Sequence, residues 1–451
     1  RPRKDMAQGS WRLASNAETM SFLGRRLGAL AARRACGPAF RPLLHQAAPV
    51  ARPALRRFAT AAEVIASNSL VKPGYEKYVG VWLAGTTGFL FSMILIGGYT
   101  RLTGSGLSMT SWKWTGASLP RTQEKWEEEF EIYKQYPEYQ RLHNGLMTLD
   151  EFKQIYFVEW FHRMWGRGAG VFFAIPLGVL IARKAMKPAL GLRLTGLLGL
   201  GFMQAVVGWW MVRSGFDVPE EHAPLSENKT PRVSPYRIAS HWTTALILYS
   251  GTFWYTLEML RAPPALMHPT PAAVSAVKKM RVAVLPAVLC IGTTLLSGPF
   301  VAGNHAGYAY NTWPKMHEDW VPPEWVSAVN NGVVRAFFES TPVVQFNHRM
   351  LAYATVASSV GAWVYSYSVP ASPALARASA FLAVTAGSQM LLGIATLLMI
   401  VPVEMGVAHQ GGAIVTLSTL LYMLHTLRLP GGAAVVAAQA ATGAAATSTA
   451  S

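Results

Sequence analysis

The chain has 451 residues, of which 51% are hydrophobic and only 14% are charged. This composition excludes an ordinary soluble globular protein of the same length and indicates a membrane protein. The formal net charge of +17 does not describe an evenly basic surface, because residues 1–60 alone hold 12 Lys and Arg against two acids. We therefore expect no nucleic-acid partner for the remainder of the chain.

Residues 1–60 are expected to be a mitochondrial transit peptide or another disordered basic segment. Between residues 21 and 60 there are eight arginines and no acid among many Ala and Leu residues, which is typical of transit peptides. The alternative, a basic tail that binds acidic lipid or nucleic acid, stays open. Cys36 would leave with a transit peptide and Cys290 would remain alone, so redox chemistry must come from a cofactor.

A stretch of about 20 apolar residues crosses the hydrocarbon layer as a helix, because a helix satisfies its own backbone groups there. The sequence contains eight such stretches, at residues 79–99, 157–182, 191–212, 239–260, 282–302, 343–367, 375–401 and 405–427. We therefore predict an all-α polytopic membrane protein with eight transmembrane helices. Residues 429–451 are predicted to form a disordered C-terminal tail.

The charges of the predicted loops set the orientation. Arg183, Lys184, Lys187 and Arg193 join the second and third stretches with no acid between them, whereas the loop 100–156 contains eight acids. Basic loops stay on the inner side of a membrane, so these loops and both termini are predicted to face the matrix of the mitochondrial inner membrane. The long loops then face the intermembrane space.

Two short motifs show that the chain is duplicated. Phe161-His162-Arg163-Met164 returns as Asn347-His348-Arg349-Met350, and each motif is followed by one more histidine at the start of a later stretch, His241 and His409. Both halves have four stretches that enter from the same side. We therefore predict two pseudo-symmetric four-helix bundles related by a parallel repeat, a first half at residues 75–262 and a second half at residues 278–428.

The four histidines open even-numbered stretches, so all are expected near the intermembrane-space face. A lone membrane histidine is more often packed or hydrogen-bonded than metal-bound, but four in a duplicated pattern favour two bis-histidine haem sites. Between the histidines of each half, Gln204 and Gly208 recur as Gln389 and Gly393. We expect the glutamines to be interhelical hydrogen-bond partners and the glycines to allow close helix packing.

One position distinguishes the two halves. Glu159 precedes His162 by three residues, whereas Gln345 takes that place before His348. Side chains at this spacing share one face of a helix, so the first half has a carboxylate beside its histidine that can accept a proton, stabilise positive charge or orient the imidazole. The alternative is that Glu159 pairs with Arg163 or lies among lipid headgroups.

Three arginines are predicted at the same membrane face, Arg101, Arg163 and Arg349. They are candidates for contacts with haem propionates, because the forked guanidinium group suits carboxylates. Snorkelling to lipid headgroups is the alternative for each of them. If the repeat holds two haems, the half with the acid is expected to be reactive and the other half to transfer electrons.

The chain resembles the haem A synthase family of mitochondria over residues 75–428. The motifs that carry the resemblance are Gly97-Gly98-Tyr99-Thr100-Arg101-Leu102-Thr103, residues 151–163, Asn311-Thr312-Trp313-Pro314 and Phe346-Asn347-His348-Arg349. The resemblance implies oxidation of the C8 methyl group of haem O to a formyl group, through hydroxylated intermediates, to give haem A for cytochrome c oxidase.

The resemblance also implies roles for single residues. His348 and His409 would be the axial ligands of a resident haem b, His162 and His241 would bracket the haem O substrate, and Glu159 would be the catalytic carboxylate. Implied partners are a ferredoxin or similar electron-transfer protein, haem O synthase and cytochrome c oxidase assembly factors, and the chain is expected to form a homo-oligomer. Two other functions stay open: a dihaem b-type electron-transfer cytochrome without substrate chemistry, and a haem carrier or assembly protein.

Overall fold

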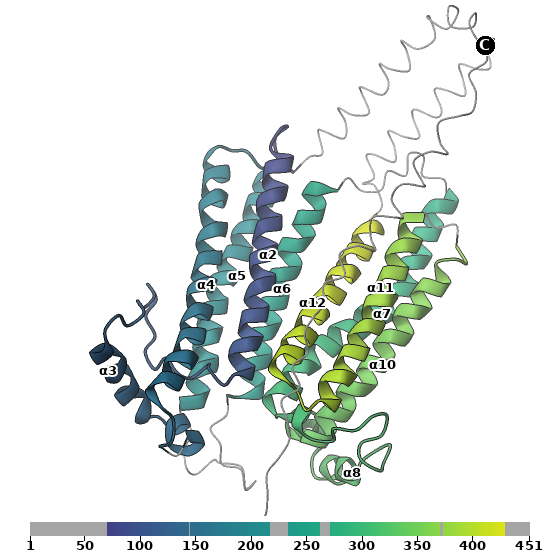
Figure 1. Cartoon of the computed structure of the whole chain (residues 1–451). Coiled ribbons are helices and arrows are strands. Elements are labelled where there is room, and N and C mark those ends of the chain that lie inside the picture. Colours follow the sequence, from purple (N-terminus) through teal and green to yellow (C-terminus); the bar gives the residue numbers. More distant parts are fainter. Residues whose placement is uncertain (1–69, 144, 217–232, 262–270, 370–372, 429–451) are drawn as a thin grey trace, which may run out of the picture. The chain divides into compact units, whose positions relative to one another are not determined.

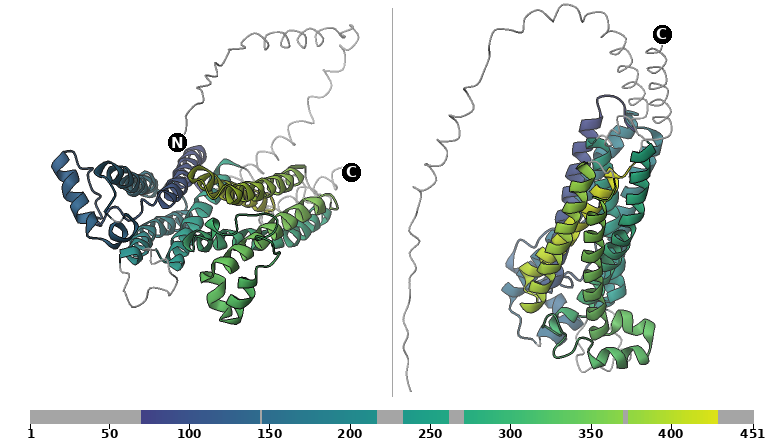
Figure 2. Two further views of the ribbon diagram at one scale, coloured as in Figure 1. Left: turned by 60° about the horizontal axis from the view of Figure 1, so that its bottom comes forward. Right: turned by 90° about the vertical axis from the view of Figure 1, so that its right-hand side faces the viewer.

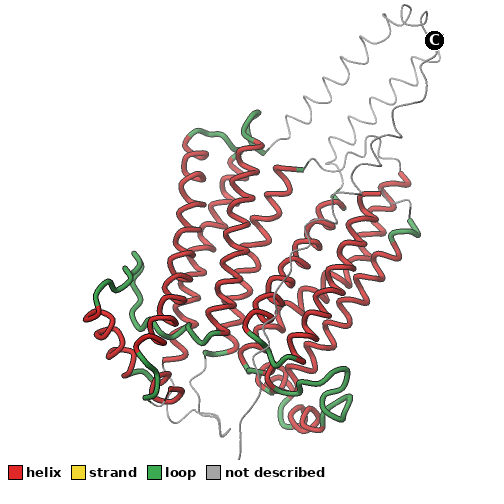
Figure 3. The backbone as a smooth tube through the Cα atoms, viewed as in Figure 1, coloured by secondary structure: helices red, strands yellow, loops and turns green. Residues whose placement is uncertain are grey.

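The computed structural model describes residues 70–143, 145–216, 233–261, 271–369 and 373–428 (Figure 1). These segments contain helices, loops and two isolated β-bridges but no strand (Figure 3). The prediction of an all-helical fold is therefore confirmed for this part of the chain. The predicted transit peptide, residues 1–60, and the predicted tail, residues 429–451, lie outside the described residues.

In the described segments, eight helices of 24 residues or more coincide with the eight predicted stretches. They are α2 (Glu76–Leu102), α4 (Leu149–Ala182), α5 (Pro188–Phe216), α6 (Pro235–Leu260), α7 (Pro271–Gly303), α10 (Thr341–Tyr365), α11 (Pro373–Leu398) and α12 (Val403–Thr426). Helix α4 begins eight residues before its predicted stretch. Its start is fixed by a capping box, in which Thr148 and Glu151 satisfy each other's free backbone amides.

Six of these described helices are long and apolar enough to cross a membrane: α2, α4, α5, α7, α11 and α12. Helices α6 and α10 do not reach this level, because polar residues near their histidines, such as Arg237 in α6 and Arg349 in α10, lower their mean hydropathy. Large apolar side chains point away from the protein, with Leu192 75% exposed and Phe202 65% exposed on α5. Such a surface fits lipid rather than water.

In chain order the long helices comprise a first group, α2, α4, α5 and α6, and a second group, α7, α10, α11 and α12, and contacts occur both within and between these groups. Helices α2 and α5 both pack against α4 and α6, while α10 packs against α7 and α11, and α12 packs against α11 and α7. The groups also touch each other, because α12 lies against α2 and α6, and α6 lies against α7 (Figure 2). One apolar core crosses this junction, and it contains Ile94 of α2 and Tyr249 of α6 together with Ile291, Leu382 and Ile414 of the second group.

The two longest connections carry short helices of their own. The α2–α4 connection holds α3 (Gln123–Lys134) and a turn at Tyr139–His143, and the α7–α10 connection holds α8 (Pro323–Asn330) and α9 (Val333–Glu339). Figure 1 shows α3 and α8 at the same end of the long helices, and the short α4–α5 connection at the opposite end. At that opposite end, residues 70–72 pair with the backbone of Ala185 and Lys187. We call the end that carries α3 and α8 the loop end.

Candidate functional site

Each predicted histidine lies on a helix of its own. His241, His348 and His409 follow the first residue of α6, α10 and α12 by six, seven and six residues. His162 lies 13 residues into α4, because α4 starts earlier than the sequence predicts. All four rings are partly buried, and His162 lies within electrostatic range of His241, as His348 does of His409. The histidines therefore form two pairs, one between α4 and α6 and one between α10 and α12.

The second histidine of the first pair is held by a glutamine and a glycine of α5. Gln204 Nε2 donates to the carbonyl of His241 at 2.9 Å and lies 3.3 Å from the ring nitrogen Nε2. Four residues further along α5, Gly208 faces the same ring, and a Cβ placed there would lie 3.1 Å from His241 Cε1. The glutamine thus fixes the histidine, and the glycine makes room for its ring.

The second pair repeats this arrangement between α11 and α12. Gln389 Nε2 donates to the carbonyl of His409 at 2.8 Å and lies 3.1 Å from the ring nitrogen Nδ1. A Cβ on Gly393 would lie 2.7 Å from His409 Cε1. Both glutamines are therefore interhelical hydrogen-bond partners, as the sequence predicts, and both glycines allow close packing against an imidazole. We call each set of glutamine, glycine and histidine a histidine cradle.

The histidine pairs fit a cofactor that takes two imidazoles from the protein. His241 Nδ1 is buried and has no hydrogen-bond partner in the described part of the chain. Gly97 of α2 lets the other ring approach α2 closely, because a Cβ there would lie 3.2 Å from His162 Nε2. Haem iron accepts two axial imidazoles, whereas no group of three or more His, Cys, Asp or Glu side chains in the described segments is arranged to hold a bare metal ion. Ligation itself stays a prediction.

Glu159 is buried, with 2% of its surface exposed, and both of its carboxylate oxygens accept hydrogen bonds. Oε2 accepts from the Ser108 hydroxyl at 2.7 Å and from the Met109 amide at 2.8 Å. Oε1 accepts from Arg163 Nη2 at 2.6 Å, one turn further along α4. The predicted alternative of pairing with Arg163 is thus observed, and the carboxylate ties loop 105–117, which follows α2, to α4. A catalytic role for Glu159 stays a prediction.

In the second half, Gln345 links α10 to the loop after α7 in the same way, but it is the hydrogen-bond donor to this loop. Its amide nitrogen donates to two carbonyls of the loop after α7, Ala306 at 2.6 Å and Ala309. Its amide oxygen accepts from Arg349 Nη2 at 3.1 Å. Glu159 therefore accepts hydrogen bonds from its loop, whereas Gln345 donates hydrogen bonds to its own loop. Both residues fasten a loop to a histidine-bearing helix, but only Glu159 has a carboxylate side chain.

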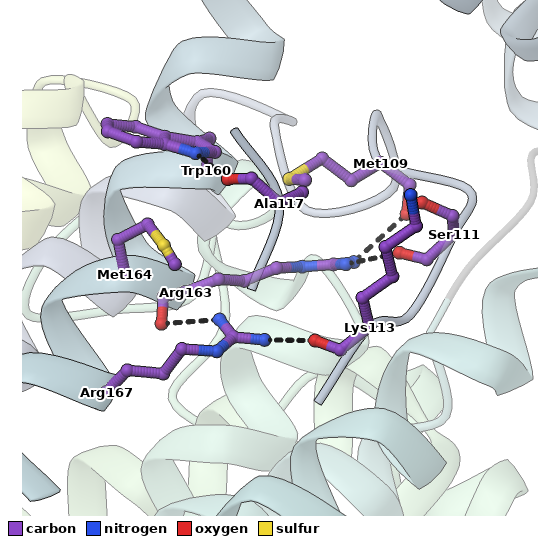
Figure 4. A pocket seen from close by; sticks show the side chains of 8 residues that line it. All are labelled: Met109, Ser111, Lys113, Ala117, Trp160, Arg163, Met164 and Arg167. Atoms are coloured by element: carbon purple, nitrogen blue, oxygen red, sulfur yellow. Dashed lines mark hydrogen bonds between the residues drawn. The ribbon is translucent and has the colours of Figure 1, made fainter. Parts of the chain in front are cut away.

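A small pocket lies between α4 and loop 105–117 (Figure 4). Arg163 lines it and donates to the carbonyls of Met109 at 3.0 Å and Ser111 at 2.8 Å. Arg167, one turn further along α4, donates to the Lys113 carbonyl at 2.6 Å. The loop is therefore fastened to α4 by two arginines as well as by Glu159.

The other two predicted arginines also bind loop carbonyls. Arg101 Nη2 donates to the Ala302 carbonyl at 3.3 Å and lies 3.3 Å from His305 Nε2, so it joins the end of α2 to the connection after α7. Arg349 Nη2 donates to the Tyr310 carbonyl at 2.7 Å. Contacts of Arg101, Arg163 and Arg349 with haem propionates remain predictions.

A second buried carboxyl lies near Glu159. Glu138 is 6% exposed, and its Oε2 accepts from the Tyr133 hydroxyl at 3.1 Å. Burial raises the pKa of Glu138 to about 8; the charge of Glu159 also raises it, whereas the Tyr133 hydrogen bond and Arg101 lower it. The sequence did not single out Glu138, because it is one of eight acids in its loop. Only its burial beside the aromatic cluster of residues 130–156 separates it from the others.

Long apolar helices that carry two histidine pairs, each with its own cradle, indicate a helical membrane protein. The chain belongs to the COX15-CtaA family of cytochrome oxidase assembly proteins, which matches residues 80–421. The match runs from within α2 to within α12 and includes all four histidines, Glu159 and both glutamines of the cradles.

Several relatives are similar over most of the chain. A protein of Arabidopsis thaliana named "Heme A synthase COX15" is 44% identical over 362 residues, which are 79% of this chain and 76% of the relative. A "Heme A synthase" of Rhodospirillum centenum is 41% identical over 356 residues, 78% of this chain and 89% of the relative. A "Heme A synthase-mitochondrial ferredoxin fusion protein" of Schizosaccharomyces pombe is 37% identical over 377 residues, 78% of this chain and 60% of the relative.

Proposed function

We propose that the protein is a haem A synthase of the mitochondrial inner membrane, an oxidoreductase that converts the C8 methyl group of haem O into a formyl group. The reaction would proceed through hydroxylated intermediates and supply haem A to cytochrome c oxidase. The observation that carries the proposal is the duplicated histidine cradle, which lies in a chain whose relatives are named haem A synthases. One cradle suits a resident haem and the other a haem that is modified.

The proposal places all eight long helices across the membrane as two pseudo-symmetric four-helix bundles, residues 75–262 and 278–428. Helices α6 and α10 would cross with the others, because their polar faces pack against neighbouring helices, α6 against α2, α5, α7 and α12, and α10 against α7 and α11. A helix covered in this way needs less apolar surface of its own. The basic α4–α5 connection and both termini would face the matrix, and the loop end would face the intermembrane space.

In this function His348 and His409 hold a resident haem b, while His162 and His241 bracket haem O until it leaves as haem A. Bound haem b supplies one-electron redox chemistry to the site. The chain orients the histidines. In each cradle the glutamine donates a hydrogen bond to the backbone carbonyl of one histidine and lies beside the ring of the same residue. Loop 105–117, fastened to α4, limits the access of water to the loop end of the first pair.

Glu159 is the proposed catalytic carboxylate of the first half. It lies one helical turn before His162, on the same face of α4. Its three donors, Ser108, Met109 and Arg163, hold both oxygens in place. A fixed carboxylate at this point would stabilise positive charge that develops on the substrate, and it would need no rearrangement to do so.

Oxidation of a methyl group requires a protein that exchanges electrons with the enzyme. The relative from Schizosaccharomyces pombe is named as a fusion with a mitochondrial ferredoxin, which supports a ferredoxin as the electron-transfer partner here. Haem O synthase and cytochrome c oxidase assembly factors are further proposed partners, since they would deliver the substrate and receive the product. We also propose a homo-oligomer, for which the exposed apolar faces of the helices leave room.

The decisive experiment is to purify the full chain and identify its extracted haems by mass. We expect haem b together with haem O, haem A or a hydroxylated intermediate. Haem b alone, in two tightly bound copies, would overturn the proposal in favour of a dihaem electron-transfer cytochrome. Haem that exchanges freely and is never modified would instead identify a haem carrier.

The role of Glu159 is tested by Glu159→Gln, which should keep haem b but yield no formyl product. Glu404→Gln, the same change at an exposed position of α12, is the matched control and should leave the product unchanged. Ser108→Ala removes one tie to loop 105–117 but keeps the carboxylate, so it should retain formyl product. Loss of product in Ser108→Ala to the same extent as in Glu159→Gln would show that Glu159 acts only by holding the loop.

A further inference from the structure

The first histidine of each pair has a different neighbour in the two halves. In the second half, Ser297 of α7 places its hydroxyl oxygen 2.6 Å from His348 Nδ1. In the first half, Gly97 of α2 faces His162 from the corresponding place, because Gly97-Gly98 matches Ser297-Gly298 at the ends of the two helices. A glycine has no side chain to offer, so one histidine is supported and the other is not.

The contacts of the Ser297 hydroxyl favour the tautomer of His348 that carries its proton on Nδ1. Its oxygen lies 2.8 Å from the Thr294 carbonyl, which can only accept, so the single hydroxyl proton is donated there. The same oxygen must then accept the proton of His348 Nδ1. With the proton on Nδ1, Nε2 keeps the lone pair that an iron ligand needs.

His162 lacks this support. The residue at the position of Ser297 is here a glycine, and the Nε2 edge of His162 faces the bare backbone of Gly97, where a Cβ would lie 3.2 Å from Nε2. The next turn of the interface shows the same contrast. Thr294 of α7 bonds Thr355 of α10 at 2.9 Å, whereas the corresponding positions of α2 and α4 hold the buried apolar residues Ile94 and Ala169.

We propose that the Ser297/Gly97 difference decides which haem stays and which haem leaves. Ser297 is a positioning residue that keeps His348 in the ligating tautomer and raises its basicity, so the second half retains its haem. Gly97 leaves His162 without this hydrogen bond and so a weaker ligand, and the first half therefore releases its haem after modification. This inference rests on the proposed function and adds to it a reason why only one of two similar sites exchanges its haem.

The magnitude follows from comparable sites. Loss of a hydrogen bond behind a metal-bound histidine typically weakens metal binding about 10- to 100-fold. We therefore expect Ser297→Ala to release haem b about 10- to 100-fold faster than the wild-type chain. The midpoint potential of the remaining haem b should rise, because a less basic imidazole stabilises ferric iron less. Ser297→Thr keeps the hydroxyl and should behave as the wild type in both measurements.

The reciprocal variant tests the first half. Gly97→Ser offers a hydroxyl to the Nε2 edge of His162, which would leave Nδ1 as the ligating nitrogen, and it should slow the release of haem O and haem A about 10- to 100-fold. Gly97→Ala is the steric control, because its Cβ would also lie 3.2 Å from His162 Nε2 but carries no hydroxyl. The full-length holoprotein in detergent is mixed with excess haem-free myoglobin, haem transfer is followed by absorbance, and the haems on both proteins are identified by mass.

Each outcome decides the inference. Faster loss of haem b from Ser297→Ala, restored by Ser297→Thr, supports it, and so does slower loss from Gly97→Ser than from Gly97→Ala. Unchanged haem b release and potential in Ser297→Ala would overturn it, as would equal rates for Gly97→Ser and Gly97→Ala. These failures are separate from failure of the proposed function, which is seen in the wild-type chain as the absence of haem O, haem A and hydroxylated haem.

Discussion

The second histidine of each pair packs closely against a glycine, which has only a hydrogen atom in place of a side chain. Gly393→Ala would bring a methyl carbon to 2.7 Å from His409, closer than atoms approach, whereas Gly208→Ala would bring one to 3.1 Å from His241. The ring in the second half must therefore move further. We expect Gly393→Ala to lower haem b retention about tenfold or more, and Gly208→Ala to have a smaller effect on the first half, both measured as haem bound per protein by absorbance.

The matched control for these variants is Gly361→Ala on α10, because a Cβ at Gly361 meets open space. It should retain the wild-type haem content. A haem b content of Gly393→Ala equal to that of Gly361→Ala would show that the ring of His409 is not held where the cradle places it.

The sequence predicts single residues well where they are duplicated and poorly where a loop supplies the contact. The four histidines and both cradle glutamines stand out because each has a counterpart in the other half. Ser108 does not, because it meets Glu159 only after loop 105–117 folds back on α4. Ser297 was not singled out from the sequence, because its contact with His348 depends on how α7 packs against α10.

The connection between α2 and α4 contains a pH-sensitive element. Glu138 is buried beside aromatic side chains that include Tyr133, and this burial raises its pKa from 4.5 to about 8. The folded segment therefore binds this proton more tightly than the unfolded segment. Protonated Glu138 therefore stabilises the folded segment. This stabilisation is fully present below about pH 4.5, decreases as the pH rises to about 8, and is lost above that value.

We expect hydrogen exchange of residues 130–143 to quicken, after correction for intrinsic rates, between about pH 6 and about pH 8. Glu138→Gln should remove this dependence, because an amide does not titrate. Glu128→Gln, at an exposed position of α3, is the control and should keep it. The same pH dependence in Glu138→Gln and in the wild-type chain would rule out Glu138 as its source.

Whole helices were easier to predict than their ends. All eight predicted stretches are helices, because long apolar runs leave few other structures. The start of α4 was placed eight residues late, because its first two turns are polar and are held by the capping box at Thr148 rather than by hydropathy. Helices α6 and α10 are less apolar than the other six long helices, since the residues that bear the site make these two helices more polar.

The molecule as a whole depends on how the two groups of helices meet. Gln410 of α12, next to His409, donates to the Ile94 carbonyl of α2 at 2.7 Å. Tyr249 of α6 bonds Ser418 of α12 at 2.8 Å. The second half therefore contacts the first through the same helix that carries one of its histidines. No feature of the sequence predicted these contacts, because they depend on the packing of helices far apart in the chain.

Whether α6 and α10 cross the membrane decides the topology of the whole chain, and three cysteines distinguish the possibilities. Each variant places one cysteine at an exposed position, in the α4–α5 connection, in α8 or at the start of α11. The three variants are Arg183→Cys, Ser327→Cys and Arg377→Cys, each made in a Cys290→Ser background. With eight spans, three helices separate residue 183 from 327 and one separates 327 from 377. In intact mitoplasts an impermeant maleimide should then label Ser327→Cys alone, and the other two only after detergent is added.

If α6 and α10 did not cross, two spans would separate residue 183 from 327 and none would separate 327 from 377. All three cysteines would then lie on one side and would be labelled together or not at all, which would contradict the eight-span arrangement. Labelling of Arg183→Cys and Arg377→Cys without Ser327→Cys would instead keep eight spans and invert them. The loop end, with both histidine pairs near it, would then face the matrix.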